Sequence, residues 1–226
     1  MKITFLGHSS FLIETTGKRL LFDPFITPNP LAKDINIDEL KPDYILLSHG
    51  HADHVADAEE IAKKTGATIV ANFEVATWFE NKGVEKTHPM NHGGSWDFDF
   101  GRVKYVNAVH SSCMPDGSYG GNPGGFVIEA GGKTFYYAGD TALTLDMKLI
   151  GEEFNIDFAF MPIGSNFTMD YKDAIKAAKF VDTKKVIGMH FDTFPYIKIS
   201  HEAALEEASK NGIDLQILEI GASVQL

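Results

Sequence analysis

The feature that most constrains this chain is a run of seven residues, Ser48-His49-Gly50-His51-Ala52-Asp53-His54, with three histidines and one aspartate. Residues 44–47 before it predict a short buried strand, and residues 56–64 after it have a helical pattern. The run therefore lies in a loop between a strand and a helix. Imidazole and carboxylate are ligands that borderline divalent metals prefer, so the run predicts a metal site.

The spacing inside this run indicates two pairs of ligands. His49 and His51 are two positions apart, so on extended backbone their side chains point the same way. Asp53 and His54 lie at the predicted helix start, where a carboxylate also suits the helix dipole. The two pairs then aim at two neighbouring points. A solvated turn rich in histidine is the alternative, but so dense a cluster is more typical of metal binding.

Three later apolar segments each end in a single histidine or aspartate beside glycine or serine. They are residues 103–109 before His110, residues 135–138 before Gly139-Asp140, and residues 186–189 before His190. Each residue alone is more typical of a cap or a buried polar group. Together they lie where α/β sheets place ligand-binding groups, at the ends of strands.

Internal similarity indicates two related halves. Residues 11–23 resemble residues 126–137, and residues 42–47 resemble residues 156–161, although such short hairpin matches also arise by coincidence. Helical patterns cover residues 59–64, 75–82, 170–181 and 201–211. Strands that are apolar on both faces need cover on both sides, which favours an α/β fold with four layers, an α/β/β/α sandwich.

Composition limits the class of protein and its partners. The chain has 226 residues and no polar linker, which predicts one domain over residues 1–226. Its net charge of −11 makes nucleic acid an unlikely partner. No apolar run approaches the roughly 20 residues of a membrane span, no cleavable signal pattern precedes the first strand, and Cys113 is the only cysteine. We therefore expect a cytoplasmic protein with a small-molecule substrate, and homo-oligomerisation stays open.

The pattern His-x-His-x-Asp-His after an apolar strand, followed by a lone His, a Gly-Asp and a final His, resembles the metallo-β-lactamase superfamily. Gly7-His8-Ser9 near the start resembles small stand-alone hydrolases related to ascorbate-6-phosphate lactonase. The resemblance implies the same four-layer sandwich with two divalent metal ions at one edge. It also implies the ligands: His49, His51 and His110 for the first ion, Asp53, His54 and His190 for the second, and Asp140 bridging both.

Zinc is the first expectation for the ions, and manganese, nickel or iron also suit mixed nitrogen and oxygen ligands. A water between two such cations should lose a proton near neutral pH. The resulting hydroxide would attack an ester, lactone or phosphodiester bond of a small molecule. Asp53 is the candidate to transfer a proton, and His8 either assists as a general acid or is only a turn residue. A nuclease-type phosphodiesterase and a non-catalytic metal-binding scaffold are the alternatives.

Several other residues have weaker signals. Asp23 is expected to brace the histidine loop without binding metal. His88 and His92 are assigned to a surface loop, and His201 to solvent. Residues 111–125 predict a structureless lid or wall, with Cys113 as a small residue that is not a ligand. Phe191, Phe194 and Tyr196 supply an apolar substrate wall, or else they are core or subunit-contact residues.

Overall fold

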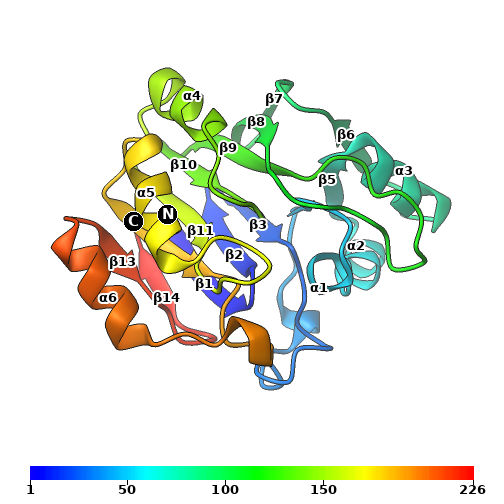
Figure 1. Cartoon of the computed structure of the whole chain (residues 1–226). Helices are drawn as coiled ribbons and strands as arrows, with labels where there is room; N and C mark the ends of the chain where they lie inside the picture. Colours follow the sequence, from blue (N-terminus) through cyan, green and yellow to red (C-terminus); the bar gives the residue numbers. More distant parts are fainter.

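Two mixed seven-stranded sheets face each other in the computed structural model, which describes all 226 residues (Figure 1). The first sheet consists, in spatial order, of β14 (Ser223–Gln225), β1 (Lys2–Gly7), β2 (Ser10–Thr15), β3 (Lys18–Phe22), β4 (Tyr44–Leu46), β5 (Thr68–Asn72) and β6 (Thr87–Met90). The second consists of β13 (Asp214–Gln216), β12 (Lys185–Met189), β11 (Phe158–Pro162), β10 (Lys133–Tyr137), β9 (Gly124–Ala130), β8 (Gly101–Asn107) and β7 (Ser95–Phe98).

Helices cover the outer face of each sheet, which completes the four layers. The first sheet is covered by α2 (Ala58–Thr65) and α3 (Phe73–Asn81), and the second by α4 (Asp146–Glu153), α5 (Tyr171–Phe180) and α6 (His201–Lys210) (Figure 1). Three short helices complete the list: α1 (Ala52–Val55), η1 (Ile37–Glu39) and η2 (Pro195–Ile197). None of the helices is long and apolar enough to cross a membrane.

The central strands of the first sheet are buried on both faces, and alternate residues contribute to different cores. Leu20 and Phe22 belong to a cluster of 43 buried residues that fills the space between the sheets and extends under the helices of the second sheet. Leu21, between them, belongs to a separate cluster of 20 buried residues under α2 and α3. The two-residue period of a strand explains this division. The expected α/β/β/α sandwich is confirmed.

The two halves have the same topology. In each, a hairpin (β2–β3 or β9–β10) is followed by strands that add in parallel on one side, β4 and β5 or β11 and β12. Strand β1 lies beside β2 as β8 lies beside β9. The similarity between residues 11–23 and 126–137 therefore corresponds to equivalent hairpins, as the sequence predicted.

Some local predictions were wrong. The helix expected over residues 56–64 is present as α2 (Ala58–Thr65), but the separate short helix α1 (Ala52–Val55) before it was not predicted. Between the two helices, the Asp57 carboxylate accepts hydrogen bonds from the backbone of Ile26 and Thr27. His88 lies in strand β6, not in a surface loop, and its ring packs on Trp96 and Phe98 at 5.0 and 4.8 Å between centroids. Helix α4 was not predicted.

Candidate metal centre

The histidine-rich run follows β4 directly and enters α1, so it connects a strand to a helix as expected. The segment around Cys113 and Met114 packs closely against this loop at Gly50. A Cβ atom on Gly50 would lie 2.5 Å from Met114 Sδ and 3.1 Å from the carbonyl oxygen of Cys113. Only glycine therefore allows the segment around Cys113 to approach this closely.

His49, His51 and His110 form a first cluster. The Nε2 atom of His49 lies 2.9 Å from Nδ1 of His51, and the His110 ring is 5.2 Å from each of the other two rings. One ligand atom from each residue lies within 4.8 Å of the others. His110, which follows β8, thus lies beside His49 and His51 of the loop.

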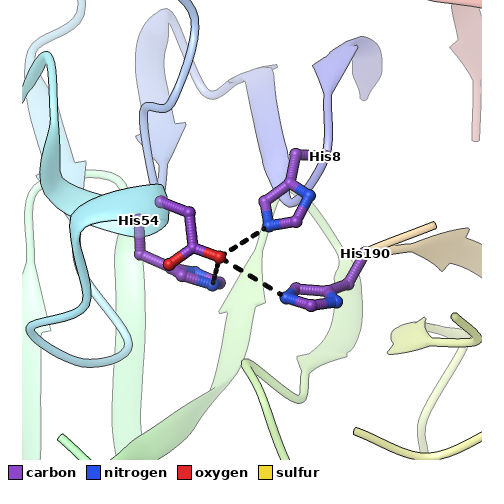
Figure 2. A group of neighbouring side chains, drawn as sticks. His8, His54 and His190 are labelled. Atoms are coloured by element: carbon purple, nitrogen blue, oxygen red, sulfur yellow. Dashed lines mark hydrogen bonds and ion pairs between the residues drawn. The ribbon is translucent and has the colours of Figure 1, made fainter. Parts of the chain in front are cut away.

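Asp53, His54 and His190 form a second cluster, together with His8. Figure 2 shows the three imidazoles turned toward one another, and the Asp53 carboxylate lies among them. Its Oδ2 atom is 3.2 Å from His8 Nε2, 3.8 Å from His190 Nε2 and 4.0 Å from His54 Nε2.

Asp140 lies between the two clusters. Its Oδ2 atom is 3.6 Å from Nε2 of His110 in the first, and 3.3 and 3.0 Å from Nε2 of His54 and His190 in the second. The turn that delivers it needs glycine, because Gly139 has φ +62° and a Cβ there would lie 2.8 Å from the Ser48 side chain. One carboxylate therefore faces both groups of histidines.

Asp23 supports the centre from behind. Its buried carboxylate accepts hydrogen bonds from the backbone and hydroxyl of Ser48 (2.7 and 2.6 Å), and lies 2.9 Å from Nδ1 of His54. The Tyr137 hydroxyl lies 2.8 Å from both Asp23 Oδ2 and the Ser9 carbonyl. These contacts occupy both carboxylate oxygens of Asp23. They also turn Nε2 of His54 toward the centre, because Asp23 holds the opposite ring nitrogen.

Three of these residues have left-handed backbone, which is rare without glycine: His8 (φ +55°), His190 (φ +57°) and Asp23 (φ +39°). His8 and His190 end β1 and β12, and the backbone N–H of His190 donates to the carbonyl oxygen of His8 at 2.8 Å. Local strain of this kind collects at functional sites.

The buried charges shift one another's pKa values in the metal-free protein. Burial, with repulsion from His190, lowers the pKa of His8 to about 4. Burial opposes the charged form of His190, but the Asp140 carboxylate outweighs it and raises the pKa of His190 to about 9. Burial likewise opposes charge on Asp53, and the neighbouring histidines, His54 first, hold the pKa of its carboxyl below the usual range.

The donor set fits divalent metal ions. Nε2 of His54 and Oδ1 of Asp140 are buried in the centre and make no hydrogen bond. Buried polar atoms without partners are costly, and a cation would satisfy both. The neighbouring donors are imidazole nitrogens and carboxylate oxygens with no thiolate, which suits zinc and also manganese, nickel or iron.

A cavity of about 680 Å³ opens above the centre. His51, Asp53, His110, Asp140 and His190 form its floor, and aromatic side chains form its walls. Phe194 and Tyr196 lie in these walls, whereas Phe191 is buried against Phe5 and belongs to the core. His8 does not line the cavity, because it lies buried behind Asp53.

The remaining candidates have other roles. Ser111 lines the cavity, but residues 111–125 are less irregular than expected, since Cys113 and Tyr119 form a bridge and β9 begins at Gly124. His92 is in a turn, as expected, yet its ring stacks on Tyr105. His201 is exposed and lies 2.7 Å from the Asp192 carboxylate.

Sequence reasoning missed four residues near the centre: Phe25, Tyr137, Phe167 and Thr193. Thr193 Oγ1 lies 3.0 Å from His8 Nδ1, and the two phenylalanines line the cavity. None of the four stands beside a motif with metal-ligand spacing. Nothing in the sequence of β10, Lys133-Thr134-Phe135-Tyr136-Tyr137, distinguishes Tyr137 from its neighbour Tyr136.

A four-layer sandwich with histidines and aspartates gathered at one edge defines the class of protein. Residues 2–190 match the model of the β-lactamase superfamily domain, so the chain is a member of that superfamily. It belongs more closely to the UPF0173 metal-dependent hydrolase family. Proteins of that name from Flavobacterium johnsoniae and Christiangramia forsetii are each 58% identical to it, over 100% of both chains.

Solved structures agree with this assignment. A metallo hydrolase from the archaeon Ignicoccus hospitalis, Igni18, superposes with a TM-score of 0.89 at 33% identity, covering 99% of this chain and 97% of that one. The metallo-β-lactamase fold protein YhfI from Bacillus subtilis has a TM-score of 0.76 at 18% identity, covering 99% and 98%. The second similarity concerns the fold alone.

Proposed function

We propose that this protein is a metal-dependent hydrolase that cleaves an ester or lactone bond of a small molecule at a two-metal centre. The observation that carries the proposal is the position of Asp140, whose Oδ2 atom faces histidines of both clusters. In this proposal His49, His51 and His110 would hold the first ion and Asp53, His54 and His190 the second, and Asp140 would be a ligand shared between the two groups.

Bound divalent ions would supply Lewis-acid polarisation of the substrate oxygen and a water acidic enough to react near neutral pH. In the hydrolysis, a water oxygen bonds to the carbonyl carbon, the carbon–oxygen bond to the leaving group breaks, and the leaving oxygen takes up a proton. Asp53 lies in the cavity floor, so its carboxylate is placed to carry that proton.

His8 acts through Asp53 in this scheme. Its ring is buried with Nε2 3.2 Å from the Asp53 carboxylate, and Thr193 lies on the other side at 3.0 Å from Nδ1. A proton on Nε2 lets the neutral ring donate to Asp53 while Nδ1 accepts from Thr193. His8 is therefore a positioning residue that fixes the Asp53 carboxylate in the orientation for proton transfer.

The cavity favours a carbonyl substrate over a phosphodiester. No lysine or arginine lines it, and phosphoryl groups are generally held by such cations in addition to metal. The net charge of −11 also repels nucleic acid at long range. A non-catalytic scaffold would not need the open cavity over the centre.

The test is a panel of 4-nitrophenyl butyrate, δ-valerolactone and bis(4-nitrophenyl) phosphate, with zinc- or manganese-loaded protein. We expect turnover of the first two to exceed that of the phosphodiester, and to fall by about 10²-fold or more in Asp140→Asn. Bound metal, measured by elemental analysis, should fall in the same variant.

Asp146→Asn is the matched control, because Asp146 is an exposed carboxylate bonded to Asn107 and belongs to none of the metal-ligand clusters. It should leave metal content and turnover unchanged. Preferential phosphodiester cleavage, or ester turnover that survives both Asp140→Asn and chelation, would overturn the proposal.

A further inference from the structure

The walls of the cavity are built from aromatic rings in two tiers. Phe25 and Phe194 form an inner pair, 6.1 Å apart between centroids, and each lies edge-on to the buried His8 ring at 5.5 and 5.4 Å. Phe167 and Tyr196 form an outer pair at the rim, 6.2 Å apart and nearly perpendicular.

Both side chains of the outer pair are exposed, Phe167 by 50% and Tyr196 by 75%. Phe167 stands on a turn with left-handed backbone at Ser165 (φ +66°) and Asn166 (φ +58°). Strained backbone that presents an apolar ring to an open cavity indicates a binding surface, because the strain and the exposure both cost stability.

Charge is confined to the cavity floor. Apart from the phenol of Tyr196, the ionisable side chains in the lining are the three histidines and two aspartates assigned above as metal ligands, and no lysine or arginine accompanies them. A negative group on the substrate, placed away from the reacting bond, would therefore lie against aromatic rings with no cation to pair with. Burying such a group without a partner is strongly unfavourable.

We propose that the part of the substrate away from the reacting bond is an uncharged apolar group, aromatic or alkyl, that lies between the inner and outer aromatic pairs. This inference rests on the proposed function for the position of the reacting bond. The cavity of about 680 Å³ has room for a group of that kind together with the carbonyl. In this proposal the aromatic walls of the cavity, and not the metal-ligand residues, exclude substrates that have a distal carboxylate or phosphate.

The first test measures binding without turnover, using N-phenyl-1-naphthylamine, a neutral probe whose fluorescence rises in apolar sites. We expect it to bind both metal-free and metal-loaded protein. The double variant Phe167→Ala/Tyr196→Ala should weaken binding by about tenfold or more, since each removes a ring from the wall. Both side chains are exposed, so the variant should fold.

A second cavity supplies the matched control. It measures about 360 Å³ between β6 and β7, and it is lined by Phe73 and Trp96, which are 56% and 54% exposed. Phe73→Ala/Trp96→Ala should leave probe binding unchanged. Loss of binding in this variant, with full binding in Phe167→Ala/Tyr196→Ala, would overturn the inference.

The second test compares two esters of equal chain length and identical leaving group, 4-nitrophenyl valerate and mono-4-nitrophenyl glutarate. They differ in a terminal methyl against a terminal carboxylate. We expect kcat/KM to favour the valerate by about tenfold or more. Phe167→Arg, which places a cation at the rim, should reduce that preference by raising kcat/KM for the glutarate.

The two ideas fail separately. A wild-type preference for the glutarate would overturn the apolar-group inference while leaving the hydrolase proposal intact. If no ester or lactone is cleaved, the hydrolase proposal fails, and probe binding that depends on Phe167 and Tyr196 still decides the inference.

Discussion

Tyr136 and Tyr137 are neighbours in β10 and both are fully buried, yet only one hydroxyl has partners. Tyr137 contacts Asp23 and the Ser9 carbonyl, whereas the Tyr136 hydroxyl makes no hydrogen bond. At the scale of single residues, this difference separates a side chain that supports the metal centre from one that only fills the core.

We predict that Tyr137→Phe lowers the free energy of unfolding by about 1–2 kcal/mol, because Asp23 loses a buried donor. Metal affinity should fall by about 10–100-fold, the usual effect of losing an outer-shell contact. Tyr136→Phe, the control, should change stability by less than about 0.5 kcal/mol or increase it. Denaturant unfolding and metal titration of both variants measure these effects, and equal behaviour of the two would contradict the supporting role of Tyr137.

The role of His8 can also be tested at the scale of single residues. We predict that His8→Ala leaves the bound metal content unchanged and lowers kcat/KM by about 10²–10⁴-fold on alkyl esters, which need a proton on the leaving oxygen. On 4-nitrophenyl esters the loss should be smaller, because their leaving group needs no proton. Steady-state kinetics on the two kinds of ester provide the measurement. Equal losses on both would remove His8 from proton transfer.

At the scale of elements, the histidine loop depends on the segment that covers it. A Cβ on Gly50 would collide with Met114 and the Cys113 carbonyl, and the Gly50 backbone N–H donates to the Ser112 hydroxyl at 3.1 Å. The loop and residues 111–114 therefore form one packed unit, so a change in either should alter the position of His49 and His51.

We predict that Gly50→Ala weakens metal binding by about tenfold or more while the protein stays folded. The added Cβ cannot fit at 2.5 Å from Met114 Sδ, so the loop must move. Isothermal titration with zinc measures the affinity, and circular dichroism monitors the fold. Met114→Ala in the same variant removes the closest contact and should restore part of the affinity; no restoration would place the cause elsewhere.

At the scale of the whole molecule, the cores do not require metal. The two clusters of 43 and 20 buried residues lie between the sheets and under the helices, and the metal-ligand clusters lie at one edge. The fold should therefore persist without metal, although the buried histidines and carboxylates are better satisfied with it.

We predict that chelation leaves the far-ultraviolet circular dichroism unchanged and lowers the melting temperature. Metal at about 1,000 times its Kd adds about 4 kcal/mol of stability, which corresponds to roughly 10 °C for a chain of this size. Thermal melts of chelated and reloaded protein provide the measurement. Asp140→Asn should show a smaller rise on reloading, and outright unfolding on chelation would contradict the prediction.

The sequence by itself determined the four-layer class and the position of the loop from Ser48 to His54. Both are encoded locally: apolar periods define strands and helices, and a ligand-dense run must follow the strand that precedes it. The repeated hairpin sequence also identified the two halves, because β2–β3 and β9–β10 occupy equivalent positions in the two sheets and need similar apolar patterns.

The family resemblance implied the grouping of His110, Asp140 and His190 with the loop, but among local patterns none brings these distant residues together, and only the tertiary structure decided that they meet. His8, His110, Asp140 and His190 come from strands in two sheets, and their convergence depends on how the sheets stack, not on any local period. The same is true of Tyr137 beneath the centre and of Phe25 and Phe167 in the cavity wall. His88 is a case in which the local sequence was misleading. Its neighbours in the sequence suggested a loop, but residues 87–90 pair in parallel with β5 and therefore form a strand.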